Sequence, residues 1–194
     1  MRLRNELEVG APLERTWKTL LDVPRVARAL PGATIGPQAE GGAWRGTMKV
    51  KLGPVTTEYA GTVRIQDVDE DDRVASYRVE GREARGQGSA AATITTRLGT
   101  VGGATRVVVE TDMQVTGRQA QLGRGLMEEV AGAILGDFAG GLERELRGDA
   151  APDGGGGEAL DVSRAVRGPV LERAGLVLAG LIAGLALGRW VWRR

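Results

Sequence analysis

The amino-acid sequence predicts an α+β fold in which a curved antiparallel sheet wraps around one long C-terminal helix. Apolar and polar side chains alternate through five segments between residues 44 and 116, as in strands with one buried face. Residues 117–147 instead repeat an apolar side chain at every fourth position, which indicates an amphipathic helix. Because the connections are short, neighbouring strands are expected to pair antiparallel, and the long helix is left to cover the concave face.

The residues before the sheet predict one strand and two short helices. Apolar side chains alternate with charged ones over residues 2–9, which predicts a half-exposed strand. Pro12 stands where the first turn of a helix tolerates proline, and Trp17 lies on the apolar side of that helix. Residues 23–30 predict a second helix, which the pair Pro31-Gly32 ends.

The strands of the sheet follow a weaker run at residues 33–40. Gly53-Pro54 is typical of a tight turn between two of them. The clear runs are residues 44–52, 55–65, 74–81, 86–98 and 105–116. The final helix carries Leu122, Leu126, Val130, Ile134, Phe138, Leu142 and Leu146 along one side.

The chain divides into a domain, a linker and a tail. Residues 1–147 are expected to form one domain, which is long enough to bury a core. Residues 148–168 include four consecutive glycines and are expected to form a flexible linker. Residues 169–194 are expected to form a separate apolar helix. The N-terminus is charged and lacks the apolar stretch of a signal peptide, so the domain is expected to fold in the cytoplasm.

Composition excludes several kinds of chemistry. The 194 residues include no cysteine and no histidine. The chain therefore offers no thiolate, no histidine base and no cysteine or histidine ligand for zinc, iron–sulfur clusters or haem. A formal net charge of +1 gives no general attraction to nucleic acid. No metal site, catalytic residue or nucleic-acid partner is assigned.

The inward rows of the sheet indicate a site for a hydrophobic ligand. They include Gly61, Gly88 and Ala90, whose small size lets a ligand or another backbone approach closely. Two interpretations stay open at this point: an apolar cavity, or direct packing of the long helix on the small residues. The candidate ligand-binding residues are Trp44, Met48, Tyr59, Gly61, Val63, Tyr77, Val79, Gly88, Ala90, Met113, Leu122, Leu126, Val130, Ile134 and Phe138.

The tail predicts membrane attachment. Residues 174–188 have no charged or polar side chain, and continuing to Trp192 gives about 28 Å of helix, close to a bilayer core of about 30 Å. Arginines on both sides leave the topology open, and a helix docked on the domain or on a partner is the alternative. The expected location is the cytoplasmic face of the inner membrane. The candidate membrane residues are Leu176, Leu178, Leu181, Ile182, Leu185, Leu187, Trp190 and Trp192.

Several strings in the domain together resemble one family. They include residues 30–33 (LPGA), 49–55 (KVKLGPV), 61–63 (GTV), 86–90 (GQGSA), 102–105 (GGAT) and 122–124 (LGR). The chain is similar to the CoxG family of carbon monoxide dehydrogenase proteins, within the START-like (SRPBCC) superfamily. The resemblance implies a helix-grip fold around an apolar cavity and a non-catalytic accessory role beside molybdenum carbon monoxide dehydrogenase. It also implies membrane recruitment and coupling to respiratory quinone.

Two non-catalytic functions are therefore open. In the first, the protein is a membrane-tethered carrier of a hydrophobic molecule, menaquinone or ubiquinone, with Tyr59 and Tyr77 at the polar end of the site. In the second, it is an adaptor that only recruits the dehydrogenase, or a related oxidoreductase, to the membrane. Arg25 and Arg28 either contact an acidic partner or are ordinary solvated side chains.

An enzyme of the cyclase type is the third hypothesis. It requires an inward acid or base with a shifted pKa, and the candidates are Glu58, Asp112 and Glu129. The alternation places Glu58 and Asp112 on outward rows, which argues against catalysis.

Overall fold

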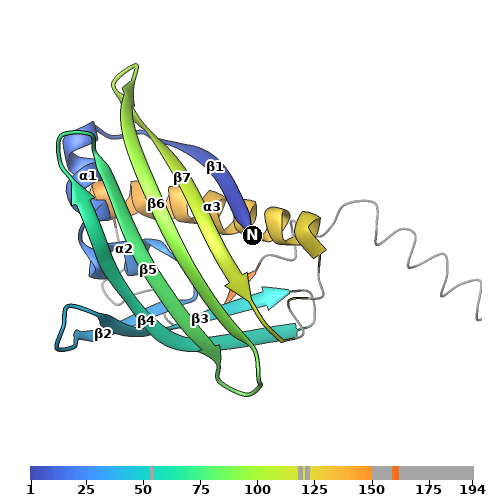
Figure 1. The fold of residues 1–194 in the computed structure, drawn as a ribbon. Coiled ribbons are helices and arrows are strands. Elements are labelled where there is room, and N and C mark those ends of the chain that lie inside the picture. Colours follow the sequence, from blue (N-terminus) through green and yellow to red (C-terminus); the bar gives the residue numbers. More distant parts are fainter. Residues whose placement is uncertain (53–54, 118–119, 121–122, 150–158, 162–194) are drawn as a thin grey trace, which may run out of the picture.

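The computed structural model describes residues 1–52, 55–117, 120, 123–149 and 159–161, and confirms the expected α+β architecture. One curved sheet carries α3 across its concave side, while two short helices lie at one end of that side (Figure 1). This is a helix-grip arrangement. The predicted membrane tail, and with it every candidate membrane residue, lies outside the described residues.

The sheet is an antiparallel meander closed by the first strand. Its order is β1-β7-β6-β5-β4-β3-β2, so all neighbours except β1 and β7 are consecutive in the chain. A short eighth strand pairs parallel with β3. The strands are β1 (Arg2–Val9), β2 (Ala33–Gln38), β3 (Trp44–Leu52), β4 (Val55–Asp69), β5 (Val74–Glu83), β6 (Ser89–Val101), β7 (Ala104–Val115) and β8 (Leu160–Asp161).

Three helices are present in the described residues: α1 (Leu13–Leu20), α2 (Val23–Ala29) and α3 (Gly123–Arg147). As predicted, α1 starts directly after Pro12, whose extended backbone precedes the first turn. The carboxylate of Asp22 caps α2 by accepting a hydrogen bond from the Arg25 backbone N–H. Both short helices therefore begin with residues that suit a helix N-terminus.

The main core lies at the C-terminal end of α3. Leu142 is fully buried there, and Leu146 and Phe138 pack in the same cluster. The helices α1 and α2 contribute Trp17 and Ala29 to this cluster. The sheet contributes inward residues of four strands, which are Val9, Ala75, Tyr77, Leu98, Val107 and Val109. This end of α3 is therefore enclosed from three sides.

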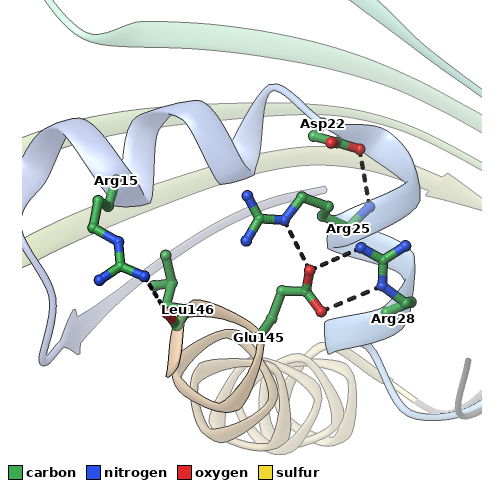
Figure 2. A network of polar contacts seen from close by, with 6 residues as sticks. All are labelled: Arg15, Asp22, Arg25, Arg28, Glu145 and Leu146. Carbon is green, nitrogen blue, oxygen red and sulfur yellow. Dashed lines mark hydrogen bonds and ion pairs between the residues drawn. The ribbon is translucent and has the colours of Figure 1, made fainter. Parts of the chain in front are cut away.

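A network of ion pairs ties α2 to the last turn of α3 (Figure 2). The Glu145 carboxylate accepts hydrogen bonds from Arg25 Nε at 2.8 Å and from two nitrogens of Arg28. The Glu145 side chain is only 6% exposed, whereas the two arginines are about one-third exposed. Arg15 of α1 donates to the backbone carbonyl of Leu146. Arg25 and Arg28 are thus neither solvated nor free for a partner, because they neutralise an acid of their own chain.

Several element boundaries differ from the sequence prediction. β4 and β5 extend beyond the predicted residues 65 and 81, and α3 begins at Gly123 rather than at residue 117. β6 begins at Ser89 rather than at residue 86, because residues 84–87 form the turn after β5. The linker expected over residues 148–168 is interrupted, because Leu160–Asp161 form β8 against the domain.

The Glu145 network makes stability dependent on acid. The hydrogen bond from Arg28 is the main cause that lowers the pKa of Glu145 below its ordinary value. A lowered folded-state pKa means that the stabilisation is fully present above the unfolded-state pKa, about 4.3, and is lost as pH falls through the folded-state pKa.

Replacing Glu145 by Gln should therefore lower the free energy of unfolding by about 2 kcal/mol at pH 7, and by progressively less below about pH 4. Urea denaturation followed by circular dichroism measures this difference. The matched control is Glu128→Gln on the same helix, because Glu128 pairs with Arg124 at an exposed position. The control should cost less than about 0.5 kcal/mol. Equal losses for the two variants, or a loss independent of pH, would contradict this account.

Candidate functional site

The candidate ligand-binding residues of the sheet lie on its concave face. Tyr77 packs in the core cluster with Phe138 and Leu142 of α3, which identifies its row as the inward one. Val79 follows two residues after Tyr77 and therefore shares its face. The register continues this face across the sheet, since Val63 pairs with Val79 and with Trp44, Tyr59 pairs with Met48, and Met113 pairs with Ala92.

The middle of this face is apolar but only half-buried. Outside the main core cluster, the exposed fraction of the inward residues is intermediate for Trp44, Met48, Tyr59, Gly61, Val63, Val79, Ala90, Ala92 and Met113. The core residues of the same rows, such as Ala75 and Leu98, are buried. One end of the concave face is therefore packed, and the other end keeps apolar surface within reach of a ligand.

The residues of α3 divide in the same way. Phe138 belongs to the main core cluster, whereas Val130 is buried in a second, small cluster with Leu126 and Ile134 beside it. Met48 and Val50 of β3 pack against that second cluster. Leu122 lies outside the described residues. Four candidate ligand-binding residues, Met48, Leu126, Val130 and Ile134, thus meet at the N-terminal half of α3.

The two tyrosines expected at the polar end of the site have different surroundings. The Tyr77 hydroxyl donates a 3.0 Å hydrogen bond to the Leu20 carbonyl, and burial raises the pKa of Tyr77 to about 12. This hydroxyl is committed to holding α1 on the sheet. Tyr59 is half-buried, and burial, followed by the nearby charge of Glu83, raises the pKa of its hydroxyl. Tyr59 is therefore the better candidate to orient a ligand.

Glu83 is a site residue that the sequence analysis missed. It pairs with Tyr59 in the register of β4 and β5, and its carboxylate accepts a hydrogen bond from the Gly88 backbone N–H at 3.4 Å. Gly88 is buried and lies just before β6 in the turn, not within the strand as predicted. Continuing the alternation of Tyr77 and Val79 by two more steps would have revealed this inward acid.

The acids proposed for catalysis do not share the site. Asp112 is exposed and bound to Arg2 on the outer face of β1 and β7. Glu129 is exposed on α3, and Glu58 is on the outward row of β4 beside Lys49. Among the described residues, no group of acidic side chains could hold a metal ion.

The sheet bends at Gly61, where β4 passes very close to β5. A Cβ atom at this position would lie 1.9 Å from the Glu80 carbonyl oxygen, so a larger residue does not fit the observed backbone. An open hollow of about 360 Å³ lies at the bend; its lining comprises Ala60, Gly61, Glu80, Gly81, Arg82, Ser89, Ala90 and Ala91. Because it is open and bordered by two charged side chains, this hollow is poorly suited to an apolar ligand.

The comparisons with known proteins agree with the fold and the family resemblance. The profile of the carbon monoxide dehydrogenase protein CoxG matches residues 6–147. The chain belongs to the CoxG family. No curated protein matches the sequence. Within the described residues of this CoxG-family chain, no helix is long and apolar enough to cross a membrane.

Solved structures show the same fold at low sequence identity. A conserved protein from Geobacillus kaustophilus is similar, with a TM-score of 0.65 and 17% identity, covering 78% of this chain and 98% of that one. A protein from Thermus thermophilus gives 0.57 and 17%, with 78% and 100% covered. A protein from Mycobacterium smegmatis gives 0.54 and 19%, with 76% and 92% covered. At these identities the likeness establishes the helix-grip architecture alone.

The bend at Gly61 provides a test of the site geometry. Replacing Gly61 by Ala should lower the free energy of unfolding by about 2–3 kcal/mol, because the added methyl group collides with the backbone of β5. The control is Gly132→Ala on the exposed side of α3, where the added methyl group meets no atom within 4 Å. It should raise stability by about 0.5–1 kcal/mol. Chemical denaturation of both variants measures the contrast, and a harmless Gly61→Ala would show that the bend is absent.

Proposed function

We propose that the protein is a membrane-tethered, non-catalytic accessory protein of a molybdenum carbon monoxide dehydrogenase, and that it carries a respiratory quinone on its concave face. Membership of the CoxG family supports the accessory role. The observation that carries the ligand proposal is the half-buried apolar row between Trp44 and Met113, which continues a fully packed core. An apolar surface of this kind gains free energy when a hydrophobic molecule covers it.

A quinone suits this surface because it joins a polar ring to a long apolar chain. The ring would lie near Tyr59, whose hydroxyl can donate a hydrogen bond to a quinone oxygen. The isoprenoid chain of menaquinone or ubiquinone would lie along the apolar row toward Met48 and Val130. Neither ligand requires a covalent link or a metal. A site that opens at one side of the sheet would also allow a long chain to protrude.

The tail supplies the proposed link to the membrane. Residues 174–188 are apolar throughout, and two tryptophans and two arginines follow them. We expect this segment to hold the domain at the cytoplasmic face of the inner membrane, where quinone is dissolved. Attachment raises the effective concentration of the domain at the bilayer. The dehydrogenase, or a related oxidoreductase, would then receive the quinone or return it.

Extraction and titration of the full-length protein test the proposal. Protein purified in detergent should release quinone on organic extraction, as detected by mass spectrometry, and should bind added menaquinone-4. Tyr59→Phe should weaken binding about fivefold, the effect of one lost hydrogen bond.

Tyr77→Phe is the matched control, because the Tyr77 hydroxyl is bound to Leu20. It should lower stability by about 1 kcal/mol and leave the affinity unchanged. If no quinone or other lipid is recovered and menaquinone-4 does not bind, the carrier proposal fails. A protein that still brings the dehydrogenase to membranes would then be the adaptor.

A further inference from the structure

The short strand β8 returns the chain to the domain after α3. Leu160 and Asp161 pair parallel with Val50 and Lys51 of β3. They use the same edge of β3 that β2 occupies further along, since β2 pairs with residues 44–48. β8 therefore extends an edge that β2 leaves uncovered.

The backbone at Gly32 is shaped to admit this strand. Gly32 has a φ of +78°, which suits glycine, and a Cβ atom there would lie 2.9 Å from the Leu160 nitrogen and 2.4 Å from the Lys49 carbonyl oxygen. Any larger residue would push β8 away. The glycine turn before β2 thus leaves the space in which Leu160 lies.

The Leu160 side chain occupies the N-terminal end of the candidate ligand site. It is 1% exposed, and it forms the second cluster with Val130. Met48, Leu126 and Ile134, which the sequence analysis assigned to ligand binding, pack against the same cluster. An apolar ligand that reached these residues would need the volume that Leu160 now fills.

The attachment of β8 is small. Among the described residues, only Leu160 and Asp161 pair with β3 in this strand, and the ion pair between Lys51 and Asp161 (3.0 Å) joins side chains that are each more than 40% exposed. Such an exposed pair contributes little to stability. The buried Leu160 side chain is therefore the main contact that holds the strand in place.

We propose that β8 is a displaceable plug of the ligand site: Leu160 fills its α3 end when no ligand is present, and a bound ligand expels it. The class of ligand rests on the proposed function, whereas the plug rests on the contacts of Leu160. Expulsion also changes the reach of the domain. With β8 docked, the chain between residues 161 and 174 can span at most about 45 Å; with β8 released, the chain from residue 149 can span about 85 Å. A loaded domain would thus reach further from the apolar segment than an empty one.

A reversible disulfide tests the plug in the full-length protein. The chain has no cysteine, so the pair Lys51→Cys and Asp161→Cys introduces the only thiols, at positions that face each other in the register. Oxidation locks β8 in place and reduction frees it. The probe is 1-anilinonaphthalene-8-sulfonate, an apolar dye, and menaquinone-4 is titrated in parallel.

The reduced protein should bind the dye about tenfold more tightly than the oxidised protein, because only the free strand can vacate the apolar slot. The control pair Arg2→Cys and Asp112→Cys joins β1 to β7 at the other edge of the sheet, where oxidation should have no effect. Leu160→Ala, without any disulfide, should bind the dye more tightly than the unsubstituted protein.

The outcomes separate the two proposals. Equal dye binding by the oxidised and reduced forms, or weaker binding by Leu160→Ala, overturns the plug; weaker binding would mean that Leu160 is a fixed wall of the site. A dye response without menaquinone-4 binding in any state supports the plug and refutes the quinone proposal. Menaquinone-4 binding that is equal in both redox states refutes the plug and leaves the carrier function intact.

Discussion

The structure depends on one constraint: α3 is held firmly at its C-terminal end only. Leu142 and Leu146 are buried there between the sheet and the two short helices, and Glu145 is bound by Arg25 and Arg28. With 25 residues, α3 is about 37 Å long and extends well past this core. Its N-terminal half lies beside a smaller cluster, which Leu160 completes.

Stability and binding are therefore assigned to opposite ends of one concave face. The packed end joins the helices to the sheet with buried side chains and a hydrogen bond from Tyr77 to Leu20. The other end keeps half-buried apolar residues and the Tyr59 hydroxyl. Regions with fewer buried contacts open at lower free energy, so a ligand can enter there without unfolding the core. The bend at Gly61 curves the sheet without contributing a side chain that would fill it.

Local patterns predicted the fold because each element follows a period of its own. Alternation placed Trp44, Tyr59 and Met113 on one face, and the fourfold repeat of α3 predicted the helix that covers it. Contacts between distant residues left no such signal. The pairing of Arg28 with Glu145 joins residues far apart in the chain, and β8 is too short for any periodicity. The inward position of Glu83 was readable, but only with the true length of β5.

Hydrogen exchange along α3 measures the central claim most directly. Amides of residues 138–147 should exchange only through global unfolding, whereas those of residues 124–134 should exchange at least about tenfold faster through local opening. Added menaquinone-4 should slow exchange in residues 124–134 and leave residues 138–147 unchanged. Uniform protection along the whole helix, or protection by the quinone confined to its C-terminal end, would contradict a helix anchored at one end that binds ligand at the other.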